Sequence, residues 1–167
     1  MEININCDLG EKSKFHSTEN DPDLLSIINS ANVACGYHAG DEETMNKVIK
    51  ISKKNGVSVG AQPSFNDPDN FGRKRINLNS SEITKLIIDQ YKILQEIAQN
   101  YDENVTHIKP HGALNNMACE DFNLANTIAK AINSISKDII FLVPTGSQME
   151  IAARKLDMKI ACEIFAD

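Results

Sequence analysis

The sequence lacks several features that mark common classes of protein. It has no tryptophan, and aromatic residues make up only 5% of its 167 residues, too few for a surface that stacks single-stranded nucleic acid. Its 17 basic residues are outnumbered by 23 acidic ones, which gives a formal net charge of −6 and argues against the basic face of a nucleic-acid-binding protein. No apolar run approaches the roughly 20 residues of a membrane-spanning helix. We therefore expect neither a nucleic acid nor a membrane as a partner.

Cysteine is also sparse and irregularly placed. The four cysteines, at positions 7, 35, 119 and 162, are far apart and form no C-x-x-C pair, which argues against a disulfide framework or a structural zinc knuckle. The N-terminal stretch MEININCDLG carries acidic residues where a secretory signal needs a basic start and an apolar run. These features predict reduced thiols and a cytoplasmic location.

The rest of the chain alternates short apolar runs with amphipathic ones. Hydrophobic residues make up 41% and charged residues 24%, the composition of a globular chain, and the length fits one domain over residues 1–167. We expect strands at 3–7, 31–35, 57–61, 105–108, 139–143 and 159–164. We expect helices at 21–29, 41–55, 79–100, 121–136 and 147–155, with a long polar loop at 62–79.

Six alternating strand–helix units predict a parallel sheet with right-handed crossovers. Such a sheet is either an open, doubly wound sheet or part of a (β/α) barrel. The sequence contains neither a G-x-G-x-x-G after its first strand nor a G-x-x-x-x-G-K-[ST], so the nucleotide-binding forms of the open sheet lack support.

Polar residues recur just beyond the expected strands, at Asp8, His38, Gln62, His111 and Glu163. The carboxyl ends of parallel strands form one rim, and active sites lie there in such folds. Asp8 could ligate a metal or orient a base, or it could cap the next turn. His38 could be an acid, a base or a ligand, or a solvated loop residue. His111 could shuttle a proton, or belong to an ordinary turn.

Two cations and one thiol near this rim could take part in binding or catalysis. Lys109 directly follows an apolar strand and could stabilise a developing oxyanion. Arg73, in the long loop, could clamp a carboxylate with two hydrogen bonds or be a surface arginine. Cys35 near His38 has the residue types of a nucleophilic pair, but we favour a buried thiol that packs the wall. We interpret His107 as a packed wall residue and His16 as solvated.

Five strings of residues together resemble one known family. They are NCDLGE (6–11), SANVACGYHAGD (30–41), GAQPSFND with FGR (60–67 and 71–73), KPHGALNN (109–116) and EIFAD (163–167). In this order they resemble the LamB/YcsF family, which provides the A subunit of the prokaryotic 5-oxoprolinase. The resemblance covers nearly the whole chain.

The resemblance implies an irregular (β/α) barrel of the glycoside hydrolase/deacetylase type. It also implies ATP-dependent hydrolysis of 5-oxo-L-proline to L-glutamate, performed together with partner subunits B and C. ATP would be a co-substrate of the complex, and the absence of a P-loop fits nucleotide handling elsewhere in that complex.

The matching positions imply roles for individual residues. The acid/base or ligand set would consist of Asp8, His38 and His111, with Lys109 beside them. A carboxylate or phosphate would be bound by Lys109 and Arg73. The positions expected to bind substrate are Asn6, Glu11, Asn32, Asp41, Gln62, Arg73, Asn116 and Glu163. Asp167 matches the last string as well.

The chain departs from the family pattern at three points. Gln62 stands where the family usually has histidine, and glutamine can hydrogen-bond but cannot take a proton at neutral pH. Asn115 stands where the family usually has tyrosine. The family also continues beyond FAD, so we expect an incomplete barrel of six units that lacks the C-terminal ones. Its open strand edges would favour association, including a homo-oligomer.

Two alternatives to a working 5-oxoprolinase subunit stay open. One is a metal-dependent, deacetylase-like hydrolase on the same barrel, with a divalent metal on Asp8, His38 and His111. The other is a non-catalytic remnant that only binds partner subunits.

Overall fold

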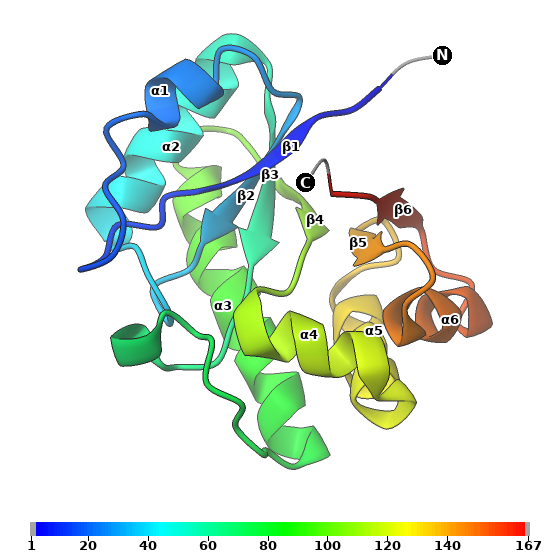
Figure 1. Cartoon of the computed structure of the whole chain (residues 1–167). Coiled ribbons are helices and arrows are strands. Elements are labelled where there is room, and N and C mark those ends of the chain that lie inside the picture. The colour runs from blue at the N-terminus through cyan, green and yellow to red at the C-terminus, as the bar shows by residue number, and fades with distance from the viewer. Residues whose placement is uncertain (1–2, 166–167) are drawn as a thin grey trace.

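The computed structural model describes residues 3–165, in which six parallel strands form one curved sheet (Figure 1). The strands are β1 (Asn6–Leu9), β2 (Ser30–Ala34), β3 (Ser58–Gln62), β4 (Val105–Ile108), β5 (Ile140–Pro144) and β6 (Ile160–Glu163). Their order across the sheet is the order along the chain. A doubly wound sheet reverses its strand order at a switch point, whereas a barrel wall does not, so the six strands form a half-barrel. The expected α/β incomplete barrel is confirmed.

The helices cover the convex side of this half-barrel (Figure 1). They are α1 (Asp21–Leu24), α2 (Glu42–Asn55), α3 (Ser80–Gln99), α4 (Gly112–Glu120), α5 (Phe122–Ile135) and α6 (Gln148–Lys155), with a 3₁₀ turn, η1 (Pro68–Asn70). Most of the core lies between the helices and the sheet, and includes the fully buried side chains of Ile49, Ile87, Leu94, Phe141 and Ile132. None of the helices within residues 3–165 combines the length and the apolar character that a membrane span requires.

The helix ends follow the signals in the sequence. The Asn79 side chain accepts hydrogen bonds from the first turn of α3, and Glu82 accepts one from the Asn79 backbone, and together these form a capping box. Asp41 accepts a hydrogen bond from the Thr44 backbone at the start of α2, and Gly56 ends that helix in the left-handed conformation.

The largest difference from the predicted elements is α4. The string after Lys109 is rich in turn residues, yet a helix begins at Gly112 because Ala113, Leu114 and Ala118 are buried in the core. Tertiary packing therefore overrides local turn preference.

Two other elements differ in their bounds. The first strand was expected at 3–7 but runs from Asn6 to Leu9, because Asn6 is the residue that pairs with the start of β2 at Ser30. The expected helix at 21–29 is one turn long, and the chain then continues through turns toward β2.

Candidate active site at the carboxyl ends of the strands

A cleft of about 360 Å³ opens at the rim formed by the carboxyl ends of the strands. Asp8 comes from β1, and Lys109 and His111 directly follow β4. The remaining lining residues are Arg73, Pro110, Gly112, Asn115, Asn116 and Phe165. Six residues that the sequence singled out, counting Asn115, therefore share one cleft.

One wall of the cleft is an ion network around Lys109. The Lys109 Nζ lies 3.2 Å from Oδ1 of Asp8 and 3.2 Å from Oε2 of Glu163. The side chains of Lys109 and Glu163 are only 9% and 7% exposed, and that of Asp8 is 34% exposed. Burial disfavours the charged amine, but the two carboxylates outweigh it and raise the pKa of Lys109. Lys109 is therefore a fixed cation at neutral pH.

Neutral side chains extend this network inward. The Asn32 Nδ2 donates hydrogen bonds to Asn6 Oδ1 (2.7 Å) and Asp8 Oδ1 (2.9 Å), and its Oδ1 lies 3.0 Å from His107 Nε2. Burial, with a smaller effect of Lys109, lowers the pKa of His107 to about 4. The imidazole is therefore neutral at pH 7 and donates to Asn32. This supports the interpretation of His107 as a packed wall residue.

Space for the His107 ring comes from Gly60 on the neighbouring strand. A Cβ atom at position 60 would lie 2.2 Å from the ring, well inside van der Waals contact. The glycine thus lets the imidazole reach Asn32.

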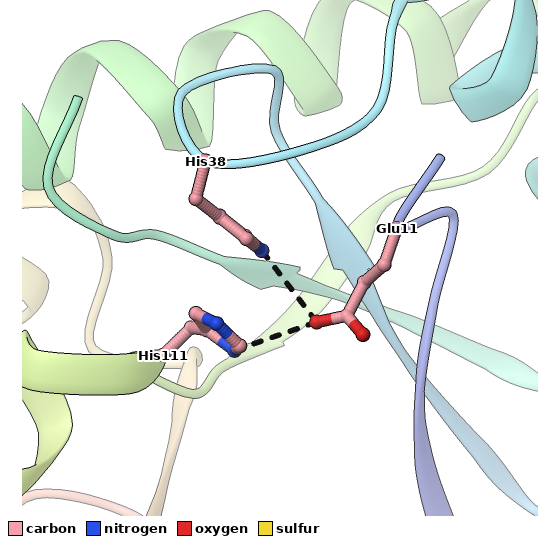
Figure 2. Close-up of side chains that lie close together, drawn as sticks. All are labelled: Glu11, His38 and His111. Atoms are coloured by element: carbon pink, nitrogen blue, oxygen red, sulfur yellow. Dashed lines mark ion pairs between the residues drawn. The ribbon is translucent and has the colours of Figure 1, made fainter. Parts of the chain in front are cut away.

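A second group, the imidazole cluster, consists of Glu11, His38 and His111 (Figure 2). The Oε1 atom of Glu11 lies 3.5 Å from His38 Nε2 and 3.4 Å from His111 Nδ1. The two imidazole rings stack at 4.1 Å between centroids with planes 12° apart. The three residues follow β1, β2 and β4, so they meet only because these strand ends share a rim.

The orientation of His111 is set by two hydrogen bonds. Its Nε2 lies 3.2 Å from the Phe71 carbonyl oxygen, and the Gln62 side-chain nitrogen lies 3.1 Å from its Nδ1. The carbonyl can only accept, so Nε2 carries the proton and Nδ1 holds a lone pair toward Glu11. Burial lowers the pKa of His111 to about 4, and the neighbouring His38 adds to this. His111 is therefore neutral at pH 7.

Glu11 is ionised beside these rings. Burial raises the pKa of its carboxyl group, but the approach of His38 and the hydrogen bond from Gln62 outweigh burial, so the pKa is lowered. The cluster therefore combines one carboxylate with two imidazoles. Groups of this kind can accept protons or ligate a divalent metal.

The long loop after β3 builds the back of the imidazole cluster. Phe71 is buried and meets the rings of His38 and His111 edge-on, at 5.4 and 5.1 Å between centroids. Gly72 follows at φ 66°, where a Cβ would lie 2.2 Å from Ser64 Oγ and 2.9 Å from His38 Cβ. Only glycine fits this position, so the long polar loop packs directly against His38.

Several residues singled out in the sequence lie outside the two clusters. Asp41 caps α2 and pairs with Lys12 at 3.0 Å, and it does not line the cleft. Arg73 and Asn116 are exposed at the cleft edge. His16 is exposed, as expected, and its ring lies 4.5 Å from that of Phe71. Asp167 lies outside the described residues.

Cys35 is fully buried, and its thiol donates to the Val33 carbonyl oxygen at 3.2 Å. Burial raises its pKa to about 12, which supports the interpretation as a packing thiol because thiolate is the nucleophilic form.

Sequence reasoning placed Asp8 with the two histidines, whereas the structure groups Glu11 with them. Asp8 pairs with Lys109, and Glu11, three residues later, faces the imidazoles. Glu11 was expected only to bind substrate. The signal that could have found it is a second acid in the NCDLGE string, beyond a glycine that can turn the chain.

The concave side of the half-barrel is a larger hollow of about 1,090 Å³. Inward-facing strand residues line it, and its borders carry exposed Ile3, Ile5, Ile164 and Phe165. In the described part of the chain, β1 and β6 each pair with one strand only, so both sheet edges are open, as expected.

Comparison with known proteins places these features in a family. The LamB/YcsF family profile matches residues 3–167. Relatives named as the A subunit of 5-oxoprolinase are similar over the whole chain: those from Nitrobacter hamburgensis and Staphylococcus carnosus are 42% and 38% identical over 100% of it. The chain spans about two thirds of the length of these relatives, 66% in both cases.

Solved structures agree with this similarity. The crystal structure of a lactam utilization protein from Thermus thermophilus superposes with a TM-score of 0.93 at 32% identity, over 99% of this chain and 67% of that one. A GH113 beta-1,4-mannanase superposes with a TM-score of 0.55 at 11% identity, over 95% of this chain and 60% of that one. The second likeness concerns the fold alone and confirms its glycoside-hydrolase type.

Proposed function

The chain belongs to the LamB/YcsF family, and from this membership we propose that it acts as the A subunit of an ATP-dependent 5-oxoprolinase. The reaction is hydrolysis of 5-oxo-L-proline to L-glutamate with partner subunits B and C. The observation that carries the proposal is one cleft in which the cations Lys109 and Arg73 lie beside the carboxylate of Asp8. The similarity to 5-oxoprolinase A subunits, over 100% of this chain and 66% of theirs, supports the choice of reaction.

The reaction requires an anion-binding site next to a proton acceptor. A lactam amide is a poor electrophile, and transfer of a phosphoryl group from ATP to its oxygen makes the ring carbon reactive toward water. After water adds to that carbon, the ring C–N bond breaks and releases the amine, and the acyl phosphate that remains is hydrolysed to the carboxylate and phosphate. The substrate carboxylate and the added phosphate are both anions, which Lys109 and the exposed guanidinium of Arg73 can bind. The carboxylate of Asp8, which lines the same cleft and is 34% exposed, can take the proton of the attacking water.

The roles within the cleft follow from burial. Lys109 is held rigidly by Asp8 and Glu163, so it is suited to stabilise charge that develops on the substrate oxygen. Arg73 has no ion-pair partner among residues 3–165 and is free to meet a carboxylate. Asn6, Asn32 and Glu163 act through Lys109 and Asp8 as positioning residues.

The test is glutamate formation from 5-oxoproline and ATP by the purified chain with subunits B and C. We expect glutamate and ADP, and we expect Arg73→Gln to raise the KM for 5-oxoproline roughly tenfold or more, the loss of one charged hydrogen bond. Arg75→Gln is the matched control, because Arg75 pairs with Glu120 outside the cleft. If a full-length relative makes glutamate and this chain makes none, the proposed activity is wrong.

A second candidate is binding of partner subunits without catalysis. The observation that favours it is the concave hollow with apolar borders and two open sheet edges. Co-purification with subunits B and C, combined with no glutamate formation, would support it. Size-exclusion chromatography of the chain alone distinguishes this from a homo-oligomer.

A further inference from the structure

The imidazole cluster has the geometry of a cation site. The carboxylate oxygen of Glu11 and one ring nitrogen each of His38 and His111 all lie within 4.8 Å of one another. Figure 2 shows the three side chains pointing toward a common point from three separate loops. Two imidazole nitrogens and a carboxylate are a frequent ligand set for divalent transition metals.

His38 supplies an independent observation. Its side chain is 0% exposed, and neither ring nitrogen has a hydrogen-bond partner among the described residues. Leaving buried polar atoms unpaired is costly, and native proteins rarely do so without a reason. The Nε2 atom points at Glu11 from 3.5 Å, a distance too long for a good hydrogen bond but suitable for two atoms that share a metal.

His111 is prepared for the same role by its other nitrogen. Donation from Nε2–H to the Phe71 carbonyl oxygen, at 3.2 Å, fixes the tautomer that leaves the Nδ1 lone pair facing Glu11. Metal-ligating histidines usually donate their second N–H to a carbonyl or carboxylate in this way.

Gln62 lies against two of the three ligand side chains. Its amide nitrogen is 3.1 Å from Glu11 Oε1 and 3.1 Å from His111 Nδ1, so its N–H groups face two of the ligand atoms. Its amide oxygen is buried and has no partner among residues 3–165. A half-turn of the amide exchanges the two atoms, places a carbonyl oxygen beside the cluster and gives it a metal to bind.

We propose that Glu11, His38 and His111 bind one divalent transition-metal cation, with the Gln62 carbonyl oxygen as a fourth ligand that turns in when the cation arrives. The nitrogen ligands favour Zn²⁺ or Co²⁺ over Mg²⁺ or Ca²⁺, which prefer oxygen. The site adjoins the cleft through His111, yet binding requires no turnover and does not depend on the proposed 5-oxoprolinase reaction.

Titration of the metal-free chain with Co²⁺ tests this, because the visible absorption of Co²⁺ reports the number and type of its ligands. We expect one equivalent to bind with nitrogen and oxygen ligands and without the strong absorption of thiolate coordination. Zn²⁺ should compete for the same site, whereas Mg²⁺ should not. Less than one equivalent of bound Co²⁺, or a thiolate spectrum, would overturn the proposal.

Variants assign the ligands. Glu11→Gln and His111→Gln should each weaken Co²⁺ binding roughly 100-fold or more, because even supporting residues of metal sites are worth 10–100-fold. His16→Ala is the matched control, since it removes an exposed imidazole outside the cluster and should change nothing. Circular dichroism establishes that each variant is folded, and if one is not, the other decides. Unchanged binding in a folded Glu11→Gln variant, or loss of binding in His16→Ala, would contradict the assignment.

Position 62 provides a graded test of the fourth ligand. Gln62→Leu should weaken binding by less than the Glu11 change, and Gln62→His should strengthen it, because imidazole is a better ligand for these metals than an amide oxygen. Equal affinity in all three chains would show that Gln62 takes no part. These experiments measure metal binding and the absorption spectrum of Co²⁺. A negative result is therefore distinguishable from a failure to form glutamate.

Discussion

The two groups at the rim, the ion network around Lys109 and the imidazole cluster of Glu11, His38 and His111, differ in how completely their polar atoms are satisfied. Lys109 contacts two carboxylates, and Asn32 ties Asp8 to the sheet. One buried atom of this network, Oε1 of Glu163, has no hydrogen-bond partner within residues 3–165. In the imidazole cluster, both nitrogens of His38 and the amide oxygen of Gln62 lack partners within the described part of the chain. The contrast indicates that the network holds a charge in place, whereas the cluster is built to receive something.

The largest effect should come from removing the cation of the network. Lys109→Met leaves Asp8 and the buried Glu163 without a counter-charge, so we expect a loss of about 3–5 kcal/mol in the free energy of unfolding. Urea denaturation measures it. The exposed pair Lys12–Asp41 provides the control, since Lys12→Met should have no measurable effect.

The same experiment on the imidazole cluster sharpens the contrast. Glu11→Gln removes a charge that has no lysine or arginine partner within residues 3–165, so its cost in unfolding free energy should be smaller than that of Lys109→Met. Equal losses of unfolding free energy in Glu11→Gln and Lys109→Met would contradict the distinction between the network and the imidazole cluster.

The inner end of the network should make stability depend on pH. His107 has a pKa of about 4 when folded and about 6.5 when unfolded, so the unfolded chain binds the extra proton between these values. Stability from His107 is therefore complete above pH 6.5 and is lost as the pH falls toward 4, by about 3 kcal/mol in all.

The lowered pKa of His111 makes stability depend on pH in the same direction. The contribution of His107 is therefore tested by comparing the unchanged chain with a His107 variant. The loss of unfolding free energy between pH 7 and pH 5 should be smaller in His107→Gln than in the unchanged chain. The same pH dependence in both chains would contradict a neutral, buried His107.

A smaller effect should follow from crowding the back of the imidazole cluster. Gly72→Ala places a methyl group against His38 and Ser64 at a positive φ, so it adds a steric clash to a backbone cost of about 1–2 kcal/mol. Gly146→Ala is the matched control, because it has φ 78° and no atom within 4 Å of the added Cβ. Thermal unfolding of both variants isolates the clash, which should appear only at position 72.

The smallest effect concerns the buried thiol of Cys35. Cys35 is buried with a pKa raised to about 12, so it should be labelled by iodoacetamide only after the exposed Cys162 and only through unfolding. Mass spectrometry of the native chain follows this order. Rapid labelling of Cys35 would restore it as a candidate nucleophile.

Local patterns carried most of the fold prediction. The alternation of strand and helix, the capping box at Asn79 and the glycine stop at position 56 all depend on neighbours within one turn or strand. The helix at Gly112–Glu120 was missed because its turn-forming residues are outweighed by the burial of Leu114, and burial depends on packing partners far away in the sequence.

The sequence predicted which residues belong to the candidate site, but it did not predict which of them contact one another. Strand-end position identified Asp8, His38, Lys109, His111 and Glu163, and family resemblance added Glu11. The sequence does not reveal which acid contacts the lysine and which contacts the histidines, because Asp8 and Glu11 lie in one string and differ only in the direction in which their side chains point. Gly10, at φ 70°, turns the chain between them.

The sequence by itself determined that strands and helices alternate and that polar residues follow the strands, because side-chain periodicity and turn chemistry are local. Only the tertiary structure decided that the strands keep their chain order in a half-barrel. It also decided that a carbonyl oxygen at Phe71 selects the tautomer of His111, 40 residues away. Such pairings arise where distant segments are packed together, and no property of either segment alone specifies them.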